Sequence, residues 1–236
     1  LRMEAYYSEP DEMVCPALLS RKRYESLRRT VDEFIFAANY HQKTLNAEGR
    51  LYKNLKTYTE LPKDEKGELL TQGVINYTDT ADEGDDFLAS VVAHVYEGEL
   101  YVTDVYYTRD GMEVTEEETA KLFSRNNVGV AKIESNNGGR GFARNVEKNL
   151  WEIHKSRKTA VTWFHQGKNK KARILTNATF IMNHMYFPVN WHDKWPEFYK
   201  AISSYQREGK NKHDDAADAL TGLAEMMDNQ PKVRRV

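Results

Sequence analysis

The order of the periodic segments constrains the fold of this chain most strongly. Three short runs rich in β-branched and aromatic residues follow one another, at 74–78, 87–95 and 100–107. Such runs are typical of strands, and the short connections between them predict an antiparallel meander. Two more strands are expected at 128–134 and 159–164, between helices at 115–126, 139–153, 169–185, 195–206 and 214–227. The order predicts an α/β protein with a mixed sheet of about five core strands flanked by helices.

The segment before the first of these strands has a different character. Ser20 is a suitable N-cap for a helix that reaches about His41, and residues 42–72 carry few periodic signals. We therefore expect residues 1–70 to form a helix and linker, and residues 71–236 to form the main domain. Within that domain Thr115 and Glu118 have the spacing of a capping box, which predicts a helix start at this point.

Composition excludes several classes of protein. No run of eighteen apolar residues is present, which argues against a membrane span, and the polar start of the chain argues against a signal peptide. The single cysteine, Cys15, excludes an internal disulfide and a cysteine-based zinc site. The chain begins with Leu1 rather than methionine, so we expect it to be a fragment of a longer protein.

Acidic residues stand where strands end and where a helix begins. Asp79 ends the first strand and Glu134 ends the fourth, while Asp215 and Asp218 lie three residues apart in the last helix. Strands one and four can lie side by side with these ends at one edge, and the helix can then add its acids. Carboxylate oxygens suit Mg²⁺ or Mn²⁺, and two such ions about 4 Å apart support phosphodiester cleavage. The pattern predicts a metal site.

The neighbours of these acids are less certain candidates. Asp214 is either a further ligand or the cap of the last helix. Asp86 is a candidate either for a further ligand or for a residue that supports the ligands, and His213 is a candidate for orienting a ligand or the water. Each of the acids also has a simpler explanation, as a turn residue at a strand end or as a complement to the helix dipole.

Charge is unevenly distributed along the chain. Residues 76–120 carry thirteen Asp and Glu against one Arg, whereas residues 121–175 carry thirteen Lys and Arg against three Glu. The basic segment can follow DNA phosphates while carboxylates elsewhere hold metal, although solvated faces can also differ in sign by chance. The candidate phosphate contacts are Arg140, Arg144, Lys168, Lys170, Lys171, Arg173, Lys210 and Lys212.

Three segments resemble the acidic motifs of one family, the nuclease domain of the phage terminase large subunit. They are YTDTADEGDD at 77–86, IESNNGG at 133–139 and KHDDAAD at 212–218. The resemblance covers about 74–227 and implies a ribonuclease H-like fold with Asp79, Glu134 and Asp215 as the catalytic acids. Many relatives carry glycine shortly before the first acid, where this chain has Tyr77-Thr78. Residues 20–55 are similar to the segment that joins the ATPase and nuclease parts of the family.

The resemblance also implies an activity and partners. Such a domain cuts concatemeric double-stranded viral DNA with two Mg²⁺ or Mn²⁺ ions, in the host cytoplasm. The partners implied are the ATPase half of the same subunit, the small terminase subunit and the portal or procapsid. Because no P-loop is present, the chain is expected to be the C-terminal part of the subunit.

Other functions remain open from the sequence. A junction resolvase or transposase core uses the same fold and the same kind of acids. A non-catalytic module that grips DNA or docks on a capsid needs no active acids at all. A phosphohydrolase built on His213-Asp214 would need further metal-binding histidines at paired spacings, which the seven histidines do not supply.

Overall fold

The computed structural model divides the chain into two compact units, Leu1–Arg50 and Leu51–Val236. The structure describes residues 6–7, 12–30, 40, 49–80, 86–134 and 139–228. None of the described helices is long and apolar enough to cross a membrane. The expected division into a helix and linker at 1–70 and a main domain at 71–236 stays a prediction. Leu51 and Tyr52 are buried in the core of the second unit.

The first unit contains two short strands and one helix. Strands β1 (Tyr6–Tyr7) and β2 (Glu12–Met13) pair antiparallel, and α1 covers Arg21–Thr30. The backbone amide of Arg23 donates to Oγ of Ser20 at 3.3 Å, as expected of an N-cap residue. The start of the predicted helix is confirmed, whereas its expected continuation over 31–39 lies outside the described residues.

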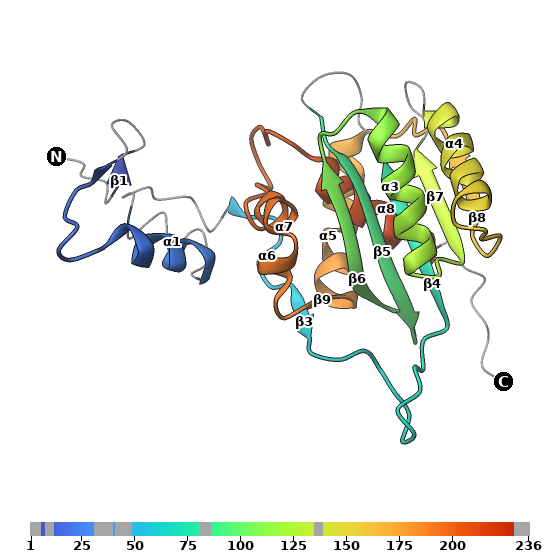
Figure 1. The fold of residues 1–236 in the computed structure, drawn as a ribbon, viewed down its shortest axis with the longest axis horizontal. Coiled ribbons are helices and arrows are strands. Elements are labelled where there is room, and N and C mark those ends of the chain that lie inside the picture. The colour runs from blue at the N-terminus through green and yellow to red at the C-terminus, as the bar shows by residue number, and fades with distance from the viewer. Residues whose placement is uncertain are drawn as a thin grey trace. The chain divides into compact units, whose positions relative to one another are not determined.

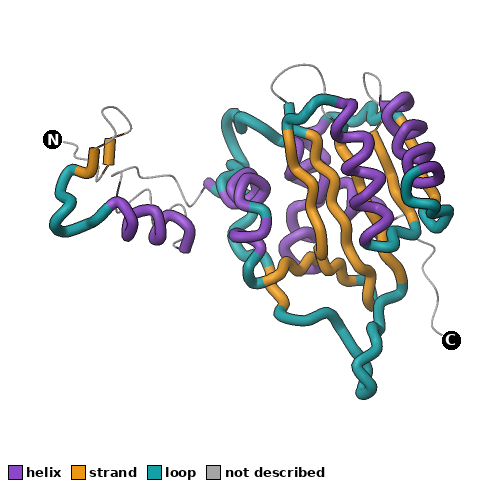
Figure 2. Tube along the Cα trace, in the orientation of Figure 1, coloured by secondary structure: helices purple, strands orange, loops and turns teal. Residues whose placement is uncertain are grey.

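The second unit is built on a mixed sheet in the order β3-β9-β6-β5-β4-β7-β8 (Figures 1 and 2). Its predicted strands are all present, as β4 (Gly73–Asp79), β5 (Leu88–Tyr96), β6 (Glu99–Thr108), β7 (Val130–Glu134) and β8 (Ala160–Phe164). Strands β4, β5 and β6 form the antiparallel meander, whereas β7 and β8 are parallel to β4. The predicted class, an α/β protein with a mixed sheet flanked by helices, is confirmed.

Two helical layers cover the sheet. In Figure 1, α3 (Met112–Arg125) and α4 (Gly139–Glu152) lie in front of it, while α5 (Lys170–His184) and α8 (Asp215–Asp228) lie behind it. Each layer has its own apolar core: Phe123 and Phe142 belong to the first, and Ile181 and Leu220 to the second. Burial of these faces fixes the register of each strand, because a slip by one residue would reverse which side chains are buried.

Three predictions about elements were wrong in detail. The helix expected at 115 begins at Met112, so Thr115 is not its cap; its buried hydroxyl donates to the carbonyl of Met112 instead. The helix expected at 195–206 is α7 (Pro196–Ser203), which ends three residues early, and a separate short helix that was not expected, α6 (Trp191–Lys194), precedes it; Pro196 favours the first turn of the new helix. Strands β3 (Lys56–Tyr58) and β9 (Met185–Pro188) were not expected, and they extend the sheet beyond its five core strands.

Candidate metal centre

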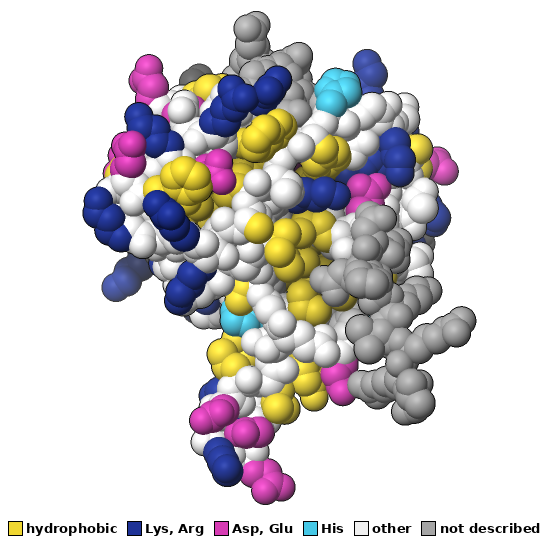
Figure 3. Space-filling view, turned by 90° about the vertical axis from the view of Figure 1, so that its right-hand side faces the viewer, with side chains coloured by type: hydrophobic (Ala, Val, Ile, Leu, Met, Phe, Trp, Pro, Cys, Tyr) yellow, Lys and Arg dark blue, Asp and Glu magenta, His cyan; other side chains and the backbone are white. Residues whose placement is uncertain are grey.

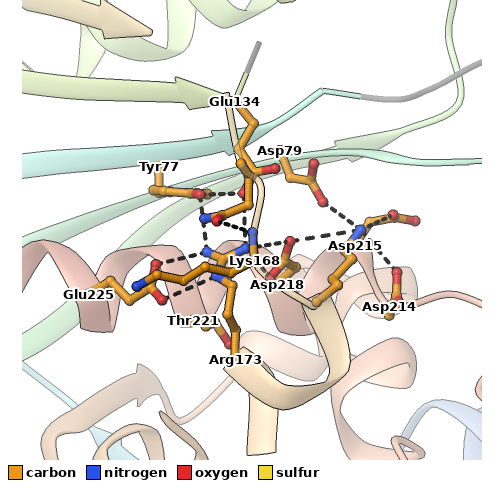
Figure 4. Close-up of polar contacts among 12 residues, drawn as sticks. Tyr77, Asp79, Glu134, Lys168, Arg173, Asp214, Asp215, Asp218, Thr221 and Glu225 are labelled. Carbon is orange, nitrogen blue, oxygen red and sulfur yellow. Dashed lines mark hydrogen bonds and ion pairs between the residues drawn. The ribbon is translucent and has the colours of Figure 1, made fainter. Parts of the chain in front are cut away.

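The predicted acids come together at one edge of the sheet. Thr78 pairs with Ile133 across the parallel β4–β7 ladder, so the next residues, Asp79 and Glu134, end their strands side by side. The first turn of α8 adds Asp215 and Asp218 (Figure 4). One ligand atom from each of Asp79, Glu134 and Asp218 lies within 4.8 Å of the others. Three separate elements therefore form one carboxylate cluster.

A second group of possible ligands adjoins the first. Ligand atoms of Asp86, His213 and Asp215 also lie within 4.8 Å of one another. The amide of Phe87 donates to Oδ2 of Asp215 at 3.2 Å, and the Phe87 ring contacts the His213 ring. Asp86 and His213, expected near the ligands, therefore lie beside Asp215.

Lys170 forms ion pairs with several carboxylates of the cluster. Its Nζ lies 3.0 Å from an oxygen of Asp79, 3.0 Å from one of Asp214 and 3.1 Å from one of Asp215. Burial alone would lower the pKa of Lys170, but these carboxylates raise it above its usual value, so the ammonium stays charged. Lys170 therefore neutralises part of the charge of the cluster from the first turn of α5. Asp214, directly before α8, takes part through this ion pair.

A buried arginine neutralises the other side. Arg173 is only 4% exposed, one turn along α5 from Asn169, whose side chain caps the helix. Its guanidinium donates to Asp218 at 2.9 Å, to Glu134 at 3.3 Å and to Glu225 at 2.9 Å. Charge-assisted bonds of this kind hold carboxylates in a fixed orientation. Arg173 therefore links Glu134 to α8.

The cluster carries more negative charge than its own cations neutralise. Among the described residues, six carboxylates (Asp79, Glu134, Asp214, Asp215, Asp218 and Glu225) share the two cations Lys170 and Arg173. Burial, with repulsion from neighbouring carboxylates, raises the pKa of Asp79 well above its usual value and that of Asp218 to about 7. Oxygen ligands with excess negative charge fit a hard divalent cation such as Mg²⁺ or Mn²⁺.

The eight basic candidates fall into two groups. Six are exposed: Arg140, Arg144, Lys168, Lys171, Lys210 and Lys212. Figure 3 views the side that carries α4 and β8, where Lys and Arg side chains surround exposed hydrophobic ones. Arg173 was expected to contact phosphate, but it is buried and bound by three carboxylates, so it is not placed to do so. The Lys170 side chain is partly buried, and its ammonium group binds the acids.

Two contributors to the site were not identified from the sequence. Tyr77 donates its hydroxyl to Glu134, and Glu225 binds Arg173. Each had a signal in its spacing: Tyr77 precedes Asp79 by two residues on the same face of a strand, and Glu225 follows Asp218 by two helical turns.

The strand order and the position of the acids define the class of the second unit, a ribonuclease H-like domain. Residues 78–186 match the family model described as "Terminase Bacteriophage T7, Ribonuclease H-like domain". This segment is therefore similar to the ribonuclease H-like domains of terminase large subunits. No curated protein is similar enough in sequence to count as a match.

Solved structures agree with this fold. The manganese-soaked, inhibitor-bound nuclease domain of the human cytomegalovirus terminase is 14% identical, with a TM-score of 0.56 over 76% of this chain and 93% of that one. The large terminase of a thermophilic bacteriophage is 12% identical, with a TM-score of 0.51 over 89% of this chain and 53% of that one. This chain thus spans about half of the phage protein.

Proposed function

We propose that the second unit is the metal-dependent endonuclease of a viral DNA-packaging terminase. The observation that carries the proposal is the convergence of ligand atoms of Asp79, Glu134 and Asp218 within 4.8 Å, in a domain whose residues 78–186 match the terminase family model. When bound, two Mg²⁺ or Mn²⁺ ions supply an activated water and stabilise the leaving oxygen in phosphodiester hydrolysis. The chain itself would then need no nucleophilic side chain.

Two ions would be held by different residues of the cluster, according to which ligand atoms lie close together. Asp79, Glu134 and Asp218 would hold one ion, and Asp215, with Asp86 and His213, would hold the other. Asp214 would contribute through Lys170, which lies 3.0 Å from it. Among these residues Asp79, Glu134 and Asp215 are proposed as the catalytic acids, because each ends or begins an element at the same edge of the sheet.

The substrate proposed is double-stranded DNA, bound without sequence preference. The exposed cations Arg140, Arg144, Lys168, Lys171, Lys210 and Lys212 are the proposed phosphate contacts. By family resemblance the partners are the ATPase half of the subunit, the small terminase subunit and the portal or procapsid, in the host cytoplasm.

The burial of the acids favours a nuclease over a non-catalytic gripping or docking module. Asp79, Glu134, Asp215 and Asp218 are each at most 6% exposed. Burying several carboxylates together destabilises the fold unless cations balance their charge, and among the described residues six carboxylates share the two cations Lys170 and Arg173. A DNA-gripping surface gains nothing from such a cluster. The resolvase or transposase alternative shares the acids, but the family match favours the terminase.

A plasmid assay tests this proposal. We expect the chain to nick and linearise supercoiled plasmid slowly with Mn²⁺, more weakly with Mg²⁺, and not at all with excess EDTA. Low activity is expected because the net charge of −2 limits nonspecific affinity for phosphate. Plasmid that stays intact with both metals, or cutting that persists in EDTA, would exclude a metal-dependent nuclease.

Replacing single exposed cations tests the DNA contacts. We expect Arg144→Ala and Lys168→Ala each to weaken binding of a random-sequence duplex and to reduce the salt dependence of log K by about one unit of slope. Lys121→Ala is the matched control, because Lys121 pairs with Glu118 on α3 outside the basic candidates. Fluorescence anisotropy from low to physiological salt measures the slopes. Equal slopes for all three variants would contradict the assignment, as would tight wild-type binding at physiological salt.

A further inference from the structure

The ring of Tyr77 lies directly on the backbone of α8. Tyr77 is 1% exposed and stands two residues before Asp79 on β4. A Cβ at Gly222 would lie 2.2 Å from Cζ of the ring, closer than two non-bonded carbon atoms can approach. Gly222 follows Asp218 by one helical turn and therefore shares its side of the helix. The absence of a side chain at Gly222 is thus what lets α8 approach β4 beneath the carboxylates.

The hydroxyl of the same ring reaches a proposed metal ligand. Oη of Tyr77 donates a hydrogen bond to Oε1 of Glu134, and Nη2 of Arg173 lies 3.3 Å from Oη. A phenol ordinarily has a pKa of about 10, so at neutral pH it carries its proton and donates to the carboxylate. Glu134 is itself 2% exposed, so water has little access to replace this donor.

We propose that Tyr77 is a positioning residue that fixes the orientation of Glu134 for metal binding, and that Gly222 is required for this contact. The inference rests on the proposed function and deepens it. Tyr77 spans the space between β7 and α8: its ring contacts the helix at Gly222, and its hydroxyl binds the carboxylate that must lie within 4.8 Å of Asp218. Outer hydrogen bonds of this kind orient ligating carboxylates and tune metal affinity.

The hydroxyl and the ring have separable roles. A phenylalanine at position 77 would fill the same space against Gly222 and preserve the apolar packing. It would remove only the donor, leaving Oε1 of Glu134 with Nη1 of Arg173 at 3.3 Å. If Tyr77 is needed for packing alone, Mn²⁺ affinity should not change in Tyr77→Phe. If Tyr77 positions Glu134, Mn²⁺ affinity should fall.

Titration of the metal-free protein with Mn²⁺ by calorimetry tests the inference. We expect Tyr77→Phe to bind Mn²⁺ about 10- to 100-fold more weakly than the wild type, while its melting temperature falls by only about 2–4 °C. In the plasmid assay the Mn²⁺ concentration for half-maximal cutting should rise in the same proportion, with a smaller change in the rate at saturating Mn²⁺. Tyr58→Phe is the matched control, because its hydroxyl donates to the carbonyl of Val102 at 2.8 Å, outside the cluster.

Gly222→Ala supplies an independent test of the ring contact. The added methyl group must displace Tyr77, so we expect Mn²⁺ affinity to fall at least as far as in Tyr77→Phe. If this variant does not fold, Tyr77→Phe alone decides the question. Wild-type Mn²⁺ affinity in Tyr77→Phe would overturn the inference and leave the nuclease proposal intact. A wild-type protein that binds no Mn²⁺ and cuts no plasmid would overturn both.

Discussion

Replacing Arg173 with alanine is expected to destabilise the second unit by about 3–5 kcal/mol, the range found when one partner of a buried ion pair is removed. The guanidinium, 4% exposed, binds Glu134, Asp218 and Glu225. Its removal leaves these carboxylates uncompensated in a poorly solvated site. For a domain of this size the melting temperature should fall on the order of 10 °C. Urea and thermal unfolding in metal-free buffer measure the effect.

Two further variants show whether burial is the cause. Arg125→Ala removes an arginine that is 49% exposed and pairs with Asp104, so we expect a loss below about 1 kcal/mol. Arg173→Lys retains the charge but not the planar fork of donors, and it should recover only part of the stability. An Arg173→Ala protein as stable as the Arg125→Ala protein would contradict the role given to the buried network.

Replacing Asp79 with asparagine is expected to lower the rate of Mn²⁺-dependent plasmid cutting by about a hundredfold or more. Changes in the residues behind a metal ligand already reduce affinity or activity 10- to 100-fold, and loss of a ligand should exceed this. Timed plasmid digestion at saturating Mn²⁺ measures the rate. Asp193→Asn is the control, because this acid on α6 is exposed and lies outside the cluster; its cutting should equal that of the wild type.

The same variant should not lose stability in metal-free buffer. Burial raises the pKa of Asp79 in the folded state above its usual value, so the wild-type fold loses stability as the pH rises from the usual pKa through the raised one. Asparagine does not ionise, so the advantage in melting temperature of Asp79→Asn over the wild type should grow with pH. A variant that cuts plasmid at the wild-type rate would contradict the assignment of Asp79 as a ligand. A variant that unfolds in metal-free buffer would contradict the expected stability.

The acidic half of the site could be predicted from the sequence because local signals fixed each position. Asp79 and Glu134 follow apolar β-rich runs, and α8 begins where Asp215 and Asp218 share a face with its buried alanines and leucines. Once two strands and a helix are placed at one edge, convergence follows from the geometry of a mixed sheet. The prediction needed no knowledge of which side chains bind one another.

The role of the cations Lys170 and Arg173 could not be predicted, because the charge of a side chain does not reveal whether it turns toward solvent or toward the interior. Lys170 and Arg173 stand in a segment rich in lysine, where an outward direction is the usual expectation, yet both turn toward the acids. Their direction depends on the packing of α5 against α8, which is a tertiary contact. Strands β3 and β9 were missed for a similar reason: runs of three and four residues carry too little pattern, and they are stabilised by tertiary pairing, of β3 with β9 and of β9 with β6.

The most direct measurement is a crystal structure of the chain soaked with Mn²⁺, with the ions located by anomalous scattering. We expect one ion in contact with carboxylate oxygens of Asp79, Glu134 and Asp218, and a second beside Asp215 with Asp86 or His213. Density only at exposed acids such as Glu113 and Glu117, with Lys170 still bound to Asp79 and Asp215 at saturating Mn²⁺, would contradict a metal centre at this edge of the sheet.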